Sequence, residues 1–285
     1  MLSLRLKIIE SLFRPFYRGL DFWPFSIRLL RHPLYRQIQF FYNNYFSHYY
    51  NFEQLVSARN VIILFCRGDR GSAEMEIIMS RDYEPEISSF ILDHLDSVDY
   101  FFDVGSNIGF YSLLVAKNNP SINIECFEPV PETFSRLTKN LERNKFLNIR
   151  PNNFGLANIN TKTDIFLHPD LGHSTLIKGQ GSPEKITVRR ADDIFDIKNK
   201  RIFIKIDTEG FEFEVLKGME KLLSLNDCQI VLEFTPEFYV KHYNDINSPS
   251  ILLSFLNSHG FTIQTIKEKT KEGAQKMLFA FQNKQ

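Results

Sequence analysis

The stretch YFFDVGSNIGFYSLLVAK occupies residues 100–117 and decides the fold class. Its apolar start, Tyr100 to Asp103, predicts a strand, and the run from Phe110 to Lys117 predicts a helix. Residues 105–109 connect the two. At such a junction, backbone N–H groups and the positive end of a helix dipole face a ligand. The sequence therefore predicts a ligand-binding loop that begins at Asp103 and runs through Gly105 to Gly109.

The next strand, expected over residues 122–127, ends at an acid. Glu128 follows Gly109 by 19 residues, where a carboxylate can accept hydrogen bonds from both hydroxyls of a ribose. The loop fits the dinucleotide fingerprint poorly, because Asn107 and Phe110 stand at its second and third glycine positions. It also lacks the G-K-[ST] of a phosphate-binding loop. Loop and acid together indicate a ribose-containing cofactor; the alternative is an ordinary turn and a surface glutamate.

From Asp99 onward, apolar runs alternate with helical patterns, which predicts an α/β fold of the Rossmann-like class. We expect a mostly parallel seven-stranded sheet, with strands at residues 100–103, 122–127, 149–154, 202–206, 229–234, 261–266 and 277–281. The last two form an antiparallel hairpin, because residues 267–276 are too few for a crossover helix. Two further strand-like runs, 164–168 and 185–189, lie in an excursion before the fourth strand.

Two helices are predicted in the second half of the chain. One carries a buried stripe of Val215, Leu216, Met219, Leu222 and Leu223. The other is expected to have Ser248 as its N-cap and to stop before Gly260.

Composition excludes several classes of protein. The 285 residues contain 34 Lys and Arg against 34 Asp and Glu, so no overall charge attracts nucleic acid. Cys66, Cys126 and Cys228 have neither metal-ligand nor CxxC spacing, which predicts no metal site at cysteine and favours a reducing, cytoplasmic setting. No apolar run approaches the roughly 18 residues of a membrane-spanning helix.

The amino terminus differs from the rest of the chain. Residues 1–40 hold seven basic residues against two acidic ones, interleaved with aromatic residues. We therefore expect a helical, basic and aromatic extension over residues 1–60, followed by one domain over residues 61–285. Such a segment suits contact with an anionic membrane surface or a partner protein. The alternative is a helical cap packed on the domain.

Three motifs carry a resemblance to a known family. The run from Phe101 to Ser112 resembles the cofactor-binding motif of the FkbM-family methyltransferases. Phe127-Glu128-Pro129 resembles the second motif of that family, and Ile204 to Gly218, with IKIDTEGFE at its start, resembles its most distinctive signature. Weaker matches lie at residues 83–85, 172–176 and 191–193. The resemblance covers about residues 80–235 and departs from the family at Ser106, often Ala, and Thr208, often Val.

This resemblance implies a methyltransferase that uses S-adenosylmethionine. It implies that the loop residues surround the methionine part of the cofactor and that Glu128 holds its ribose; the loop residues are Asp103, Gly105, Ser106, Asn107 and Gly109. Asn153 is expected beside the adenine, with a loop cap as the alternative. The acceptor class that the family implies is a hydroxyl of a sugar or glycan, so we expect O-methylation in the cytoplasm or at a membrane surface.

An alcohol acceptor must lose a proton, and ligands of open α/β sheets bind at the carboxyl ends of the strands. Asp207 ends the fourth strand and is the first candidate for the base. Glu209 and Glu233 lie nearby, and Asp207 with Glu233 could instead hold a divalent cation. For Glu209 and Glu212 the competing explanation is that a helix dipole favours acids at a helix start.

His173 lies in a polar loop where a lid over the acceptor is expected, and it is a further candidate base. The alternative is a solvated loop histidine. Two other functions remain open from the sequence: a non-catalytic module that brings a partner to a membrane, and an N-methyltransferase acting on a peptide or small metabolite.

Overall fold

The structure is a computed structural model that describes residues 54–59, 62–66, 74, 77, 81–167, 174–175, 182–243, 248–266 and 276–282. The chain divides into two compact units, of which one ends at Tyr83 and the other comprises residues 84–169 and 173–285. The expected membrane or partner surface at residues 1–40 lies outside the described residues. So does His173, the histidine predicted for a lid.

The first unit contains a hairpin. Its strands β1 (Gln54–Ala58) and β2 (Ile62–Cys66) pair in antiparallel register, and Val56, Ala58 and Leu64 are buried. The Nε of Arg59 donates to the Asp82 carboxylate at 2.7 Å. The hairpin has one strand on each side of residue 60, where the sequence analysis placed the limit between the extension and the domain. That limit, between residues 1–60 and 61–285, stays a prediction. Among the described residues, no helix has the length and hydropathy needed to cross a bilayer.

The second unit is built on the predicted sheet. Its strands are β3 (Tyr100–Val104), β4 (Asn123–Phe127), β5 (Ile149–Asn152), β10 (Arg201–Ile206), β11 (Asp227–Phe234), β12 (Phe261–Ile266) and β13 (Lys276–Gln282). Their order across the sheet is β12-β13-β11-β10-β3-β4-β5. The pairs among β5, β4, β3, β10 and β11 are parallel, whereas β13 runs antiparallel to both of its neighbours. The expected Rossmann-like fold with a terminal antiparallel hairpin is confirmed.

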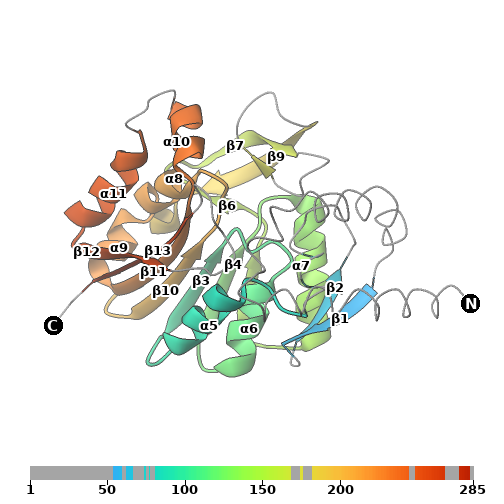
Figure 1. The fold of residues 1–285 in the computed structure, drawn as a ribbon. Helices are drawn as coiled ribbons and strands as arrows, with labels where there is room; N and C mark the ends of the chain where they lie inside the picture. The colour runs from blue at the N-terminus through green and yellow to red at the C-terminus, as the bar shows by residue number, and fades with distance from the viewer. Residues whose placement is uncertain are drawn as a thin grey trace, which may run out of the picture. The chain divides into compact units, whose positions relative to one another are not determined.

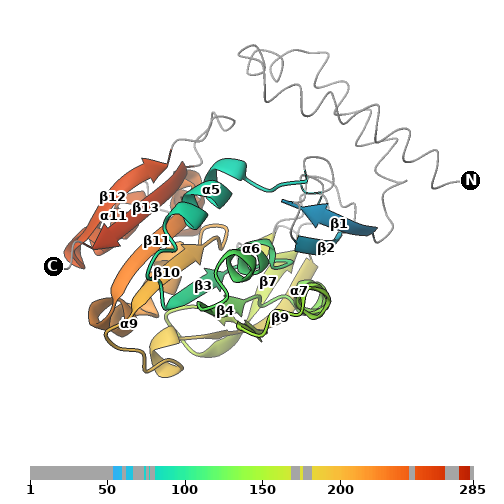
Figure 2. The same ribbon diagram turned by 90° about the horizontal axis from the view of Figure 1, so that it is seen from below.

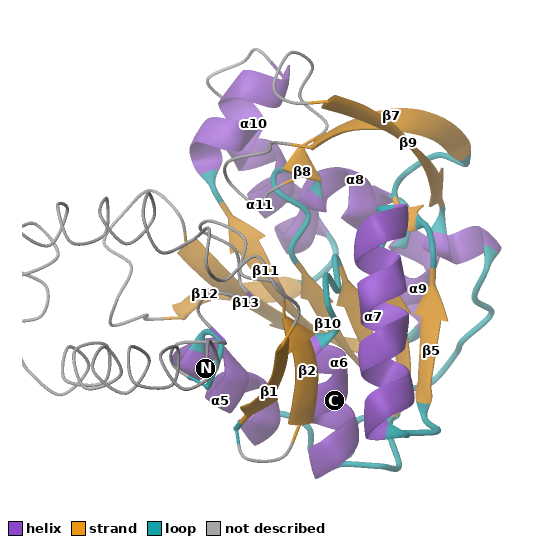
Figure 3. Cartoon of the chain, turned by 90° about the vertical axis from the view of Figure 1, so that its right-hand side faces the viewer, coloured by secondary structure: helices purple, strands orange, loops and turns teal. Residues whose placement is uncertain are grey.

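Helices cover both faces of this sheet (Figures 1 and 2). One face carries α5 (Pro85–Asp93), α6 (Phe110–Asn118) and α7 (Pro131–Asn144), and Figure 3 shows α7 beside the edge strand β5. The other face carries α8 (Glu212–Lys217), α9 (Glu220–Leu225) and α11 (Ser248–Ser258). A further helix, α10 (Pro236–Tyr243), follows β11. The helix from Ser248 starts and stops close to the predicted positions.

The alternation of side chains along the central strands separates two environments. Phe102, Ile202, Ile204 and Ile206 belong to the buried cluster that packs against α8, α9 and α11. Phe101 and Phe203 stack on the opposite face with ring centroids 5.8 Å apart. Side chains two residues apart on a strand share a face, so Asp103 and Lys205 lie on this second face beneath the cofactor loop.

A second sheet holds the predicted excursion. The strands β6 (Gly155–Leu156), β7 (Thr161–Leu167), β8 (Ser174–Thr175) and β9 (Ser182–Arg189) are ordered β6-β9-β7-β8. Both expected runs, 164–168 and 185–189, fall largely within β7 and β9. The third strand of the main sheet, β5, ends at Asn152 and not at residue 154 as expected, and residues 155–156, which follow the expected strand, pair with β9 of the second sheet.

The single helix predicted through residues 215–223 is wrong in one respect. The chain forms two short helices, α8 and α9, with a break at Gly218 and Met219. All five residues of the expected stripe are buried. The break occurs where Gly218 packs so closely on residue 157 that an added Cβ would overlap the Ala157 carbonyl. The hydrophobic period thus predicted the buried face but not the interruption.

Candidate functional site

The predicted loop lies between β3 and α6, at the carboxyl ends of the central strands. The backbone N–H groups of Gly105 and Ser106 both donate to the Phe127 carbonyl, at 3.1 and 3.0 Å, and that of Gly109 donates to the Ser106 carbonyl at 2.8 Å. Asn140 of α7 supports the loop from outside, since its side-chain amide donates to the Ile108 carbonyl at 2.8 Å. The loop is therefore held in one conformation by the neighbouring strand and helix.

Gly105 shows why a glycine is needed in this loop. Its φ is +76°, a conformation that residues with a Cβ adopt at a cost. An added Cβ would also overlap the backbone carbonyl of Asp207 at the end of β10. The loop after β3 and the segment after β10 are thus in direct backbone contact, and the N–H of Asp207 donates to the Val104 carbonyl at 3.0 Å.

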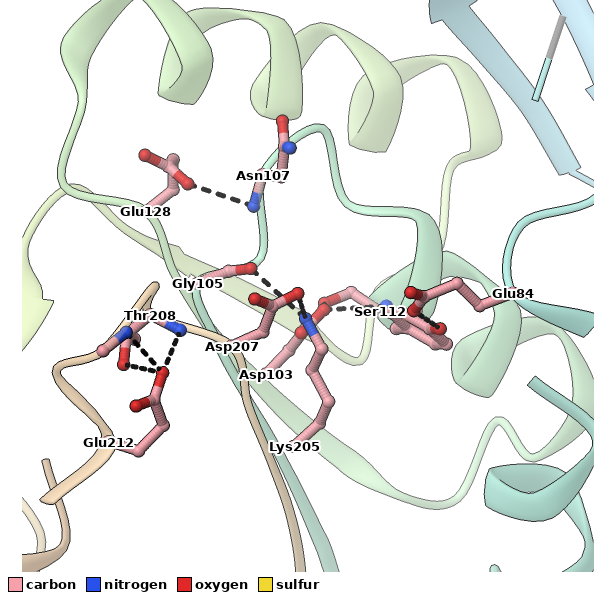
Figure 4. A network of polar contacts seen from close by, with 12 residues as sticks. Glu84, Asp103, Gly105, Asn107, Ser112, Glu128, Lys205, Asp207, Thr208 and Glu212 are labelled. Carbon is pink, nitrogen blue, oxygen red and sulfur yellow. Dashed lines mark hydrogen bonds and ion pairs between the residues drawn. The ribbon is translucent and has the colours of Figure 1, made fainter. Parts of the chain in front are cut away.

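Glu128 lies beside the loop, as expected. Its carboxylate accepts from the backbone N–H of Asn107 at 3.0 Å and from that of Val130 at 2.9 Å, and Figure 4 shows the contact with Asn107. Burial raises the pKa of Glu128 to about 7, although the two N–H groups act in the opposite direction. Each carboxylate oxygen can accept a second hydrogen bond, so Glu128 keeps capacity for hydroxyl donors. Asn153 donates to the Glu128 carbonyl at 3.0 Å and to that of Pro129 at 3.3 Å; its role toward adenine stays a prediction.

Asp103 is fully buried at the end of β3. One oxygen, Oδ2, accepts from the hydroxyl and the backbone N–H of Ser112, at 2.6 and 3.1 Å. The other, Oδ1, has no hydrogen-bond partner among the described residues, and the same holds for the buried hydroxyl of Ser106. Burial raises the pKa of Asp103, opposed by Lys205 and Ser112. Two buried polar atoms of the loop region therefore have no hydrogen-bond partner in the described part of the chain, which is rare for buried polar groups.

Lys205 lies at the centre of the site and is 2% exposed. Its ammonium donates to Asp207 at 3.1 Å and to the Gly105 carbonyl at 3.5 Å, and it lies 5.1 Å from the ring centroid of Tyr111. Burial lowers the pKa of Lys205, but the carboxylates of Asp207, Asp103 and Glu84 raise it by more, so the net pKa lies above its ordinary value. Lys205 is a permanent cation between two carboxylates (Figure 4).

Asp207, Glu209 and Glu233 converge from two strands. Each contributes one carboxylate oxygen to a group in which all oxygens lie within 4.8 Å of one another. Asp207 and Glu209 follow β10 and are half-buried, whereas Glu233 is buried near the end of β11. Burial first, and then the neighbouring Asp207 carboxylate and a hydrogen bond with it, raise the pKa of Glu233 to about 11. These surroundings favour the neutral form of Glu233, whereas the ammonium of Lys205 favours the ionised form of Asp207.

Glu212, which belongs to the family signature and for which the helix dipole was the competing explanation, is 1% exposed. One carboxylate oxygen accepts from the N–H and the hydroxyl of Thr208, both at 3.2 Å, and from the N–H of Gly210 at 3.0 Å. The other accepts from the hydroxyl of Tyr239 at 2.6 Å. Burial raises the pKa of Glu212, and these donors oppose the rise. Glu212 thus ties the segment after β10 to helix α10.

The structure brings together the predicted loop, Glu128, Asp207 and Glu209, while His173 lies outside the described residues. Sequence analysis assigned no role to Lys205 or Tyr239. A signal for Lys205 was present, because it interrupts the strand RIFIKI with a charge that must be paired if buried. Tyr239 had no such signal, since its contact joins residues 27 apart in the sequence.

Comparisons with known proteins agree on the type of protein. The model of the methyltransferase FkbM domain matches residues 103–263. The hexuronic acid methyltransferase AglP of Haloferax volcanii is 32% identical over 153 residues, which are 52% of this chain and 61% of that protein. Methyltransferase 1 of Beauveria bassiana is 26% identical over 145 residues, covering 42% of this chain and 58% of that protein. The matches thus span about three fifths of each of these relatives.

Among solved structures, the precorrin-6y C5,15-methyltransferase of Geobacter metallireducens aligns at 14% identity with a TM-score of 0.43, covering 74% of this chain and 94% of that protein. The family match extends over more than half of the 285 residues and includes the loop, Glu128, the signature at Asp207 and Glu233. The chain therefore belongs to the methyltransferase FkbM domain family.

Proposed function

We propose that this chain transfers a methyl group from S-adenosylmethionine to a hydroxyl of a sugar-type acceptor. The observation that carries the proposal is the meeting of the glycine loop, Glu128 and Asp207 at the carboxyl ends of adjacent strands, where open α/β sheets bind ligands. Family membership supports the reaction type. The name of the relative AglP, a hexuronic acid methyltransferase, supports a sugar-type acceptor.

The residues present fit this cofactor. Close packing at Gly105 leaves the loop backbone near Asp207 without an intervening side chain. The buried Ser106 hydroxyl and the Asp103 Oδ1, which lack partners within the described residues, suit a polar ligand such as the amino acid part of the cofactor. Glu128 can accept from ribose hydroxyls, and Asn153 lies next to it. When bound, the cofactor supplies an electrophilic methyl group on a positively charged sulfur.

Asp207 is the residue that we assign to removal of the acceptor proton. The backbone of Asp207 lies beside Gly105, and its side chain is 24% exposed. The ammonium of Lys205 lies 3.1 Å from Oδ2 of Asp207. The ion pair leaves the carboxylate ionised and orients it, and a partly exposed carboxylate can still reach an incoming hydroxyl. Glu209 borders the same space and is the second candidate base, while burial and the neighbouring Asp207 raise the pKa of Glu233 and favour its neutral form. His173 remains a candidate from the sequence alone.

A divalent cation held by Asp207, Glu209 and Glu233 is a competing hypothesis for the same carboxylates. Their converging oxygens suit a hard cation. The ammonium of Lys205, 3.1 Å from Asp207, already supplies a positive charge to this group of carboxylates. We therefore propose a metal-free mechanism. Unchanged turnover after dialysis against EDTA supports it, and loss of turnover restored by Mg²⁺ or Mn²⁺ contradicts it.

The variant Asp207→Asn tests the assignment of the base. We expect kcat to fall by about 10²- to 10⁴-fold, the usual contribution of general acid–base catalysis, while calorimetry with S-adenosylhomocysteine gives an unchanged Kd. The matched control is Asp227→Asn, because Asp227 is a partly exposed strand aspartate that pairs with Arg201 at the start of β11. Full activity of Asp207→Asn removes this residue from the mechanism.

The acceptor is tested with labelled cofactor and a set of neutral glycosides, uronic acid glycosides, peptides and small amines. We expect label on a sugar hydroxyl. Label on a nitrogen replaces O-methylation with N-methylation. Failure of the folded protein to bind S-adenosylhomocysteine refutes the proposal altogether and favours a non-catalytic module.

A further inference from the structure

The turn between β10 and α8 has an unfavourable backbone conformation. Glu209 has a φ of +54° and Gly210 has a φ of +96°. The left-handed region is unfavourable for a residue with a Cβ, so Glu209 adopts it only because surrounding contacts impose it. This turn follows Asp207 directly and carries Glu209, so its conformation determines where both carboxylates point.

The contacts that impose this conformation come from Glu212. Its carboxylate accepts three hydrogen bonds from Thr208 and Gly210, the residues on either side of Glu209. Its remaining oxygen accepts from the Tyr239 hydroxyl at 2.6 Å. Tyr239 is fully buried in α10, and its ring packs 5.4 Å from that of Phe234 at the end of β11. The position of the carboxylate is therefore fixed from both ends.

We propose that Glu212 and Tyr239 are positioning residues that hold the turn at residues 208–210 and thereby place Asp207 and Glu209 for catalysis. The catalytic part of this inference rests on the proposed function, whereas the structural part does not. The hydrogen bonds of Glu212 join Tyr239 to the turn at Thr208 and Gly210, so both residues act through the turn. Binding of the cofactor should thus depend on them much less than turnover does.

The helix-dipole explanation predicts a different behaviour. An acid that merely complements a helix start contributes through its charge, and replacing it by an uncharged isostere removes that contribution. A hydrogen-bonding role survives such a replacement. In Glu212→Gln the side-chain carbonyl can still accept from Thr208 and Gly210, and the amide can donate to the Tyr239 oxygen, which is able to accept. Glu212→Ala leaves these buried donors without partners.

Two measurements on the full-length protein test the inference. The first is amide hydrogen exchange of the segment around residues 207–212, which requires no knowledge of the acceptor. We expect the Thr208 and Gly210 amides to exchange at least about tenfold faster in Glu212→Ala, and a few-fold faster in Tyr239→Phe. We expect Glu212→Gln to stay within about threefold of the wild type. Glu220→Ala is the control, since Glu220 is an exposed acid in the first turn of α9.

The second measurement compares kcat with the Kd for S-adenosylhomocysteine. At a temperature where every variant is folded, Glu212→Ala should lose at least about tenfold in kcat with less than about twofold change in Kd, and Glu212→Gln should restore most of the activity. Unchanged amide exchange in Glu212→Ala overturns the inference, as does a Glu212→Gln variant that is as impaired as Glu212→Ala. A wild type that binds no cofactor refutes the proposed function, whereas the exchange measurement still decides whether the turn is held as described.

Discussion

Replacing Lys205 by methionine should destabilise the fold far more than replacing any surface lysine. Methionine keeps most of the apolar stem, so the change removes mainly the ammonium group. In the structure this group is 2% exposed and lies 3.1 Å from Asp207, with the fully buried Asp103 beside it in the strand register. Its removal leaves two carboxylates without their cation in a site with little access to water.

The expected cost follows from these contacts. Breaking a buried ion pair by removing one partner costs about 3–5 kcal/mol. The 24% exposure of the Asp207 side chain allows water to compensate in part, and Asp103 can take up a proton. We therefore expect Lys205→Met to lower the free energy of unfolding by about 3 kcal/mol. The matched control is Lys185→Met, which removes an exposed pair between β9 and Asp164 of β7 and should cost at most about 1 kcal/mol.

Guanidinium denaturation at pH 7, followed by far-ultraviolet circular dichroism, measures both values. In a double-mutant cycle, Asp103→Asn should recover at least about 1 kcal/mol in the Lys205→Met background, because the two groups are neighbours. The reasoning is refuted if Lys205→Met costs no more than Lys185→Met, or if the two substitutions at residues 103 and 205 are additive.

Two further predictions concern the cofactor loop. Gly105→Ala should abolish binding of S-adenosylhomocysteine in calorimetry or prevent folding, because the added Cβ overlaps the Asp207 carbonyl; Gly260→Ala, at nearly the same φ of +77° but with open space around it, should show only the backbone strain. Burial raises the pKa of Glu128 to about 7. Between pH 4.5 and 7, the folded state therefore keeps a proton on Glu128 that the unfolded state has released. Protonated Glu128 therefore stabilises the folded state at low pH. This contribution to the free energy of unfolding, about 3 kcal/mol, is lost as the pH rises. In urea titrations, Glu128→Gln should remove this part of the pH dependence while Glu132→Gln, at an exposed position, leaves it; equal profiles for all three proteins would contradict the assignment.

Local sequence information was sufficient for most of the fold. Alternating apolar runs and helical periods predicted the seven strands of the main sheet, and a short polar link predicted the antiparallel pairing of its last two strands. The positions of the glycine loop and of Glu128 were predictable because each is marked by a residue type at a fixed place after a strand. Such features are encoded within about 30 residues, the size of one βαβ unit, and need no knowledge of distant contacts.

Features that depend on close approach between distant segments were not predictable in this way. The interruption between α8 and α9 lies where Gly218 packs against Ala157, which lies 61 residues earlier in the chain. The expected third strand ends two residues early, at Asn152, and residues 155–156 just beyond it pair with β9, which lies about 30 residues later in the chain. In both cases the local pattern was compatible with two outcomes, and packing between distant parts of the chain selected one.

The sequence by itself determined which strands and helices form and which acids lie at the carboxyl edge of the sheet, because hydrophobic period and strand order are local properties. Only the tertiary structure decided what each acid does. Asp207 is paired with a buried ammonium, Glu233 is desolvated beside another carboxylate so that its pKa is raised, and Glu212 is enclosed by donors from the turn and from Tyr239. The ionisation and orientation of a carboxylate depend on its burial and on its partners, and those partners meet only when the chain has folded.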